Sequence, residues 1–120
     1  MFRLNLYIRI ATDNITVRNI DEGSGVTKRA DLPFSSERLL VGNFTNADKL
    51  MRAAVSEAQT MSFLPRSIRA VVHPMDKTEG GLSQIEDRVL RELAAGAKVS
   101  KVVVQIGDLL SDAQVIQKMA

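Results

Sequence analysis

Basic and aromatic side chains alternate with aliphatic ones along the first ten residues. Arg3, Tyr7 and Arg9 share one side of this period-two pattern, which is typical of a β-strand with one buried face. A second run, residues 15–18, alternates in the same way and would bring Arg18 to that side if the two runs pair as a hairpin. These four side chains could bind an acidic partner protein. A solvated face of an antiparallel sheet has the same composition, so both interpretations stay open.

Residues that could do acid–base or metal chemistry gather around the sole histidine, His73. A histidine at a strand end could carry protons, but no nucleophile or second ligand is placed beside it, which favours a structural role. The acidic residues that follow it are better explained as loop charges, helix-surface charges or a helix cap than as metal ligands. They are Asp76, Glu79, Glu86 and Asp87. We therefore predict no catalytic residue, no metal site and no cofactor.

The elements that would position these residues start with three short strands. Hydrophobic alternation and turn residues predict them at residues 2–10, 14–20 and 26–30, with an irregular connector over 31–44. Depending on the register, Lys28 or Arg29 of the third strand would join the basic face. Within the connector, we expect residues 39–41 to pack against the core.

Helices and strands alternate in the rest of the chain. The first helix is expected to begin at Thr45, with Asp48 three residues later approximating a capping box, to continue through Met61 and to stop at Pro65. A nearly continuous apolar strand, residues 68–72, would follow, and such strands are usually covered on both faces.

Two further helices carry clear start signals. Ser83 with Glu86 forms a full capping box, and Ile85 is the first residue of the stripe expected to be buried. Ser111 with Gln114 opens the last helix in the same way. An apolar strand over residues 101–106 would lie between these two helices.

The order of elements predicts an α/β fold. Meandering strands followed by alternating helices and strands imply a mixed sheet whose later crossovers are parallel and right-handed. We predict a ribonuclease-H-like sheet of about five strands in the order 3-2-1-4-5, with the helices mainly on one face. At 120 residues we expect one domain spanning residues 1–120.

Composition narrows the class of protein. Hydrophobic residues make up 45% of the chain and cysteine is absent, which indicates a packed globule without disulfides or thiolate metal sites. No apolar run reaches membrane-spanning length, so we expect a cytoplasmic protein without a membrane span. The net charge of +2 is mild, and Tyr7 is the only aromatic on the basic face, so a nucleic-acid-binding function is not favoured.

Three short motifs lie in order along the chain, at residues 8–17, at residues 41–50, and at residues 71–74 with 81–88. Together they resemble the first subdomain of the bacterial actin-like rod-shape proteins (the MreB-type family). Residues 8–17 are similar to the family's first phosphate loop, I-D-L-G-T-A-N-T-L-V, and keep Ile8, Thr12, Asn14 and Val17. Residues 41–50 resemble I-A-D-F-x-V-T-E-K-M. Residues 71–74 and 81–88 resemble V-P-x-G-I-T-E-V-E-x-R.

The resemblance implies a nucleotide site whose chemistry has degenerated. Its residues would be Arg9, Ala11, Thr12 and Asn14. Arg9 stands where the family has the aspartate that helps organise the nucleotide-bound metal and water. Ala11 stands where a glycine lets backbone amides approach phosphate. The family's site is a cleft between two such halves, of which this sequence supplies one, and ATPase activity is therefore not expected.

Two functions remain open at this point. The first is a non-catalytic actin-like module that acts through protein–protein contacts, in cell-shape or cytoskeletal organisation, with an actin-like protein among the candidate partners. The second is a residual nucleotide-binding half-site completed by a partner chain. We further expect that the apolar strand at residues 102–106 leaves a sheet edge open, and that this edge or the adjacent helix face forms a homodimer or binds a heterologous partner.

Overall fold

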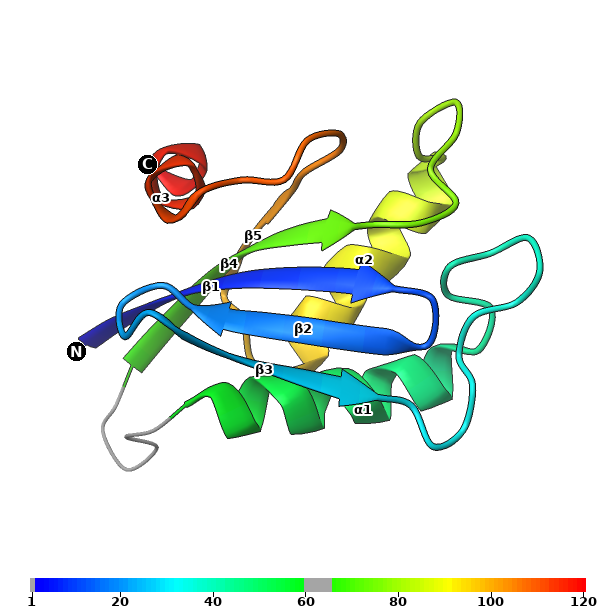
Figure 1. Cartoon of the computed structure of the whole chain (residues 1–120), viewed down its shortest axis with the longest axis horizontal. Coiled ribbons are helices and arrows are strands. Elements are labelled where there is room, and N and C mark those ends of the chain that lie inside the picture. The colour runs from blue at the N-terminus through cyan, green and yellow to red at the C-terminus, as the bar shows by residue number, and fades with distance from the viewer. Residues whose placement is uncertain (1, 60–65) are drawn as a thin grey trace.

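The computed structural model describes residues 2–59 and 66–120. They form one five-stranded sheet in the order β3-β2-β1-β4-β5 with three helices (Figure 1). The elements are β1 (Phe2–Ala11), β2 (Asn14–Asn19), β3 (Ser24–Arg29), α1 (Phe44–Ala58), β4 (Arg66–Pro74), α2 (Gln84–Gly96), β5 (Lys101–Val104) and α3 (Asp112–Met119). The predicted strand order is confirmed. No helix in these two described stretches is long and apolar enough to span a membrane.

The sheet is mixed, with β1 at its centre. β1 pairs antiparallel with β2 and parallel with β4, whereas β2–β3 is antiparallel and β4–β5 is parallel. Both pairings that the prediction required of β1 are present. The chain first meanders through a hairpin and then returns through helical crossovers, as the element order indicated.

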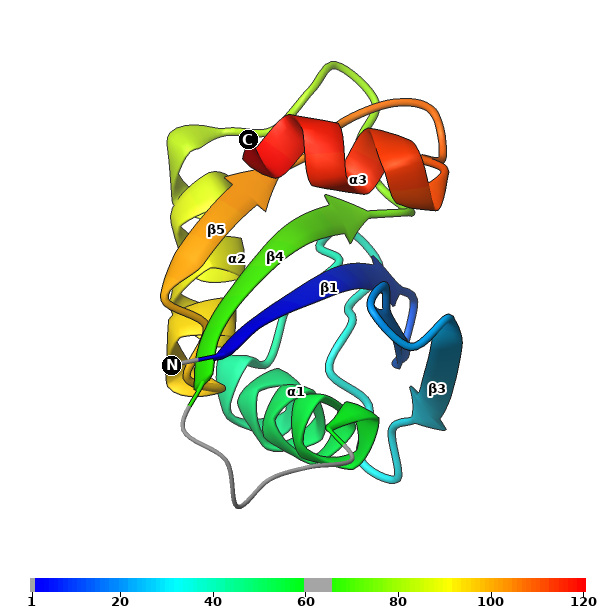
Figure 2. The same cartoon turned by 90° about the vertical axis from the view of Figure 1, so that its left-hand side faces the viewer.

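Helices cover both faces of the sheet. The even-numbered side chains of β1 pack with α1 and α2 in the main core; they are Leu4, Leu6, Ile8 and Ile10. α3 lies over the opposite face (Figure 2). There, Tyr7 and Val71 pack against Val115 and Met119 of α3. The predicted placement of helices mainly on one face holds for α1 and α2, and α3 closes part of the other.

The register places the basic side chains as the hairpin model expected. Tyr7 lies opposite Arg18, and Arg9 lies opposite Thr16. On β3, Arg29 lies opposite Asn14 and joins the face of Arg9. Lys28, one residue earlier, points to the α1 side, where it forms an ion pair with Glu57. Alternation along a strand allows only one of Lys28 and Arg29 on a given face.

The start of α1 differs from the sequence prediction. Asn43, in extended conformation, is the N-cap, and its side chain accepts a hydrogen bond from Asn46 N–H. The predicted start at Thr45 is therefore wrong. Asp48 forms an i,i+4 ion pair with Arg52 instead of a capping box. Asparagine is favoured over threonine as an N-cap residue, and Asn43 caps this helix in place of Thr45. The predictions for Met61 and Pro65 lie outside the described residues.

The other two helices begin where they were predicted. The capping boxes at Ser83 and Ser111 are both formed. Ile85, however, is 76% exposed, so its predicted burial is wrong. It lies in the first turn of α2, whose buried side chains begin only at Leu90. The last strand ends at Val104, before the expected residue 106.

The connector between β3 and α1 contributes to the core. Phe34 is completely buried and Leu40 nearly so, whereas Leu39 is 45% exposed. The segment thus packs against the sheet without forming a helix or strand. Its backbone is held by hydrogen bonds from Gly42 and Asn43 N–H to Phe34 O.

Candidate functional site

The turn between β1 and β2 brings the four predicted nucleotide-site residues to one end of the sheet. Ala11 and Asn14 are paired across the hairpin, Thr12 lies in the turn, and Arg9 precedes them on β1. The Asn14 side-chain amide donates a hydrogen bond to Thr12 O over 3.1 Å. The structure therefore brings these four residues together at one turn.

An acidic side chain from the β4–α2 loop is bonded to the tip of this turn. Asp76 Oδ2 accepts hydrogen bonds from Thr12 N–H at 2.8 Å and from the Thr12 hydroxyl at 3.0 Å. In a phosphate-binding loop, a backbone N–H of this kind would face the ligand. Here the donor is already satisfied by a carboxylate.

A second carboxylate at the tip fixes the connector. Asp13 has a positive φ of 56°, a conformation that aspartate tolerates better than most residues. Its Oδ1 accepts hydrogen bonds from the backbone N–H groups of Phe34 and Ser35. Ser35 Oγ in turn lies 3.2 Å from Asp13 N–H. Sequence reasoning assigned Asp13 to the turn but gave no sign of this long-range role.

Arg9 lies over an aromatic ring instead of a carboxylate. Its guanidinium carbon is 5.6 Å from the centre of the Tyr7 ring, a cation–π arrangement. Arg9 Nε is buried and has no hydrogen-bond partner in the described part of the chain. Within the same part, no group of three or more histidine, aspartate or glutamate residues is placed to hold a metal ion.

The predicted partner-binding face is only partly exposed. Tyr7 is 2% exposed because α3 lies over it, so the expectation that its side chain is available to a partner is wrong. Arg18 forms a bidentate ion pair with Asp112 at the start of α3, with N···O distances of 2.7 and 2.9 Å. This bonding raises the pKa of Arg18 and lowers that of Asp112. Arg3 remains exposed and Arg9 is half-buried.

The buried polar groups beneath α3 form a chain of hydrogen bonds. His73 Nε2 lies 2.9 Å from Gly107 O, and because a carbonyl only accepts, Nε2 carries the proton. Nδ1 then accepts from the Tyr7 hydroxyl at 2.6 Å. The same hydroxyl oxygen accepts from Leu110 N–H at 3.2 Å. Every member of this chain is bonded.

The environment of His73 favours its neutral form. Burial lowers its pKa most strongly, the hydrogen bond to Gly107 raises it, and the nearby charge of Arg9 lowers it further. The side chain is 1% exposed, so it is part of the core and not a residue at a loop edge. This geometry gives His73 a structural role.

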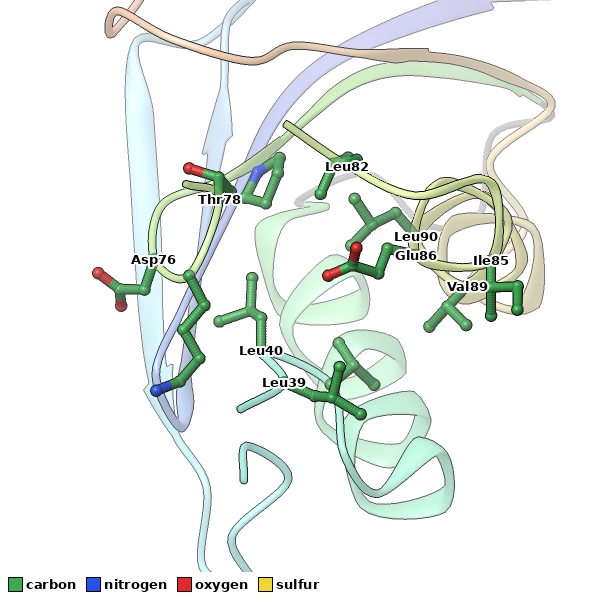
Figure 3. A pocket seen from close by; sticks show the side chains of 12 residues that line it. Leu39, Leu40, Asp76, Thr78, Leu82, Ile85, Glu86, Val89 and Leu90 are labelled. Carbon is green, nitrogen blue, oxygen red and sulfur yellow. The ribbon is translucent and has the colours of Figure 1, made fainter. Parts of the chain in front are cut away.

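A small apolar pocket lies between the connector, the β4–α2 loop and α2. Figure 3 shows Leu39 and Leu40 facing Val89 and Leu90 across it, with Asp76 directed away toward the hairpin. The pocket has a volume of about 80 Å³. Leu39 and Ile85, on its rim, are among the exposed large hydrophobic residues of the described chain. The sequence did not reveal this pocket, because its walls come from three separate segments.

Comparison with solved structures identifies the fold. The ethanolamine utilization protein EutJ from Carboxydothermus hydrogenoformans superposes with a TM-score of 0.58 at 16% sequence identity. The match covers 86% of this chain and 36% of EutJ, so the chain spans about a third of that protein. EutJ has an actin-like ATPase fold, and the predicted fold class is thereby confirmed.

Comparison with known sequences gives a relative but no described activity. No family model matches the chain. The uncharacterized protein YjaA of Escherichia coli (strain K12) is 40% identical over 101 residues, which are 80% of this chain and 78% of YjaA. At this identity and coverage, the chain belongs to the same family as YjaA.

Proposed function

We propose that this chain is a non-catalytic protein with an actin-like fold that acts through protein–protein contacts. The likeness to EutJ supports the fold, and the name of YjaA specifies no activity. The three motifs that resemble rod-shape proteins suggest a function in cell-shape or cytoskeletal organisation.

The observation that carries the proposal is the contact between Thr12 and Asp76. A phosphate using Thr12 N–H would have to displace the Asp76 carboxylate, which accepts from both the amide and the hydroxyl. If the phosphate and the Asp76 carboxylate both stayed near the turn, two like charges about 4 Å apart would repel each other. The repulsion would be about 4 kcal/mol at an effective dielectric constant of about 20, which is typical near a protein surface. The Asp76 carboxylate therefore disfavours phosphate binding at this turn.

Arg9 supports the same conclusion. A magnesium ion bound with nucleotide requires oxygen ligands, and a guanidinium supplies none. Arg9 is also engaged with the face of the Tyr7 ring. Metal-assisted ATP hydrolysis at this position would therefore need a different arrangement of residues.

Calorimetric titration with Mg-ATP tests the proposal. We expect no binding heat with the wild-type chain at millimolar nucleotide. The Asp76→Ala variant, which frees Thr12 N–H, is the informative comparison, and binding heat with this variant alone would show that the Asp76 carboxylate opposes nucleotide binding. Titrations at low and high protein concentration would include any site completed by a second copy. Micromolar binding by the wild-type chain would contradict the proposal and favour the nucleotide-binding half-site.

Exposed aliphatic side chains support the protein-contact part of the proposal. Leu39 and Ile85 flank the pocket beside α2, and Ile106 and Leu109 are exposed in the segment between β5 and α3. β5 itself is an edge strand. Exposed apolar groups beside an open sheet edge are typical of surfaces that bind another protein.

A further inference from the structure

The other edge of the sheet borders a groove. Among the strands of the described residues, β3 pairs only with β2, and α1 runs alongside it, as Figures 1 and 2 show. The groove between them has a volume of about 550 Å³. One wall consists of residues 27–32 and the other belongs to α1. The α1 residues are Asn46, Lys49, Leu50 and Ala53.

The backbone of β3 presents unused hydrogen-bonding groups to this groove. Ala30 N–H donates to Asp13 O at the end of the β2–β3 ladder. Because bonded and non-bonded pairs alternate in an antiparallel ladder, the N–H and C=O groups of Gly25, Thr27 and Arg29 face away from β2. An exposed strand edge of this kind is a template for a further strand.

The charges around the groove are mostly positive. Lys28, Arg29 and Lys49 line it, together with one acidic residue, Asp31. Lys28 is neutralised by Glu57 at 2.7 Å. The other two cations form no ion pair within the described residues. Arg29 lies on the face of β3 that points away from α1, and Lys49 lies on α1. The two cations without an ion pair therefore belong to opposite walls of the groove.

The apolar part of the groove suits peptide side chains. Leu32 is 62% exposed, and Leu50 is half-buried on the α1 wall. None of the lining residues is aromatic, so the groove has no ring on which a nucleic-acid base could stack. This composition favours a peptide over a single-stranded nucleic acid.

We propose that the β3 edge binds an extended acidic segment of a partner protein as an added strand. The inference rests on the proposed function, because it gives the protein–protein contact a site and a partner chemistry. Main-chain hydrogen bonds to Gly25, Thr27 and Arg29 would supply the pairing. A carboxylate on one face of the added strand would reach Arg29, and one on the face toward α1 would reach Lys49, while apolar side chains contact Leu32 and Leu50.

A synthetic probe tests the site directly. A fluorescently labelled octapeptide with the repeat Glu-Glu-Val-Val, blocked at both ends, places both residue types on each face of an extended strand. It is titrated by fluorescence anisotropy at 50 and 300 mM salt. We expect binding that weakens at the higher salt concentration, and no binding of the peptide with lysine in place of glutamate. Arg29→Glu and Lys49→Glu should each weaken binding at least tenfold. Arg38→Glu makes the same charge change away from the groove and should leave binding unchanged.

The strand-addition geometry has its own pair of variants. Thr27→Pro removes an N–H that faces the groove without removing a bond to β2, a position where edge strands tolerate proline. Thr27→Val keeps the N–H and loses only the hydroxyl that contacts Thr16. We expect the proline variant to lose peptide binding and the valine variant to retain it. If circular dichroism shows that Thr27→Pro is unfolded, the Arg29 and Lys49 charge reversals decide.

Three outcomes would overturn the inference. The first is that the wild-type chain does not bind the glutamate peptide. The second is that a folded Thr27→Pro variant still binds it. The third is that the wild-type chain binds polyuridylate as tightly as it binds the peptide. The first outcome without Mg-ATP binding would reject only this groove and leave the proposed function in place. Micromolar Mg-ATP binding would instead contradict the proposed function, whatever the peptide does.

Discussion

The Tyr7 hydroxyl lies 2.6 Å from His73 Nδ1, across the junction of β1 and β4 and beneath α3. The parallel register places Arg9 opposite His73 and Tyr7 opposite Val71, so Tyr7 and His73 are diagonal neighbours on one face. Their rings stack, with centres 5.9 Å apart. Gly107 and Leu110 complete the chain of bonds, which ties the segment before α3 to the sheet.

Replacing Tyr7 with phenylalanine should weaken this attachment. The ring can still pack against Val115 and Met119, but His73 Nδ1 and Leu110 N–H both lose their partner. Leaving buried polar groups unsatisfied costs roughly 1–3 kcal/mol, so we expect a decrease of that size in the free energy of unfolding. Urea denaturation measures it. An unchanged midpoint and slope would show that the hydroxyl contributes nothing to stability.

The pH dependence of stability should report the neutral state of His73. Its pKa in the folded chain lies below the ordinary histidine value of 6.5, so the unfolded chain binds more protons as the pH falls below that value. The contribution of His73 to the free energy of unfolding therefore increases as the pH rises to about 6.5 and decreases as the pH falls below that value. We expect a smaller free energy of unfolding at pH 5.5 than at pH 7.5. His73→Gln, which has no titrating ring, should show a smaller difference between the two pH values, and an equal difference would contradict this assignment.

Local sequence signals predicted most of the fold. Period-two alternation located β1 and β2, and the Ser83 and Ser111 capping boxes located the starts of α2 and α3. Each of these signals depends only on residues that lie within a few positions of one another in the chain. The covering of Tyr7 by α3 was missed because it depends on how a distant helix docks. The same applies to the Thr12–Asp76 contact, whose partners are 64 residues apart in the chain.

Substitutions at Asp13 should separate backbone conformation from hydrogen bonding. Asp13→Gly keeps the positive φ but loses the carboxylate that binds Phe34 and Ser35 N–H. Asp13→Ala loses the carboxylate and also strains the backbone, at a further cost of order 1 kcal/mol. We expect both variants to be less stable than wild type, with alanine the worse of the two. Thermal and urea denaturation measure the order, and equal stability of alanine and wild-type chains would contradict it.

Self-association through the β5 edge is tested best at Ile106. Val103 on β5 is unsuitable, because it packs against the cluster formed by Tyr7, Val115 and Met119, and a lysine there would disturb that packing. Ile106 is 43% exposed and lies just beyond β5, so Ile106→Lys adds a charge next to the edge without removing a buried side chain.

If the edge joins two copies, light scattering should show a wild-type mass that rises with concentration toward twice that of one chain. The Ile106→Lys variant should remain monomeric at those concentrations. Arg88→Glu, which changes an exposed charge on α2, is the control and should behave as wild type. A wild-type chain that stays monomeric at millimolar concentration would exclude a homodimer through this edge and leave it to a heterologous partner.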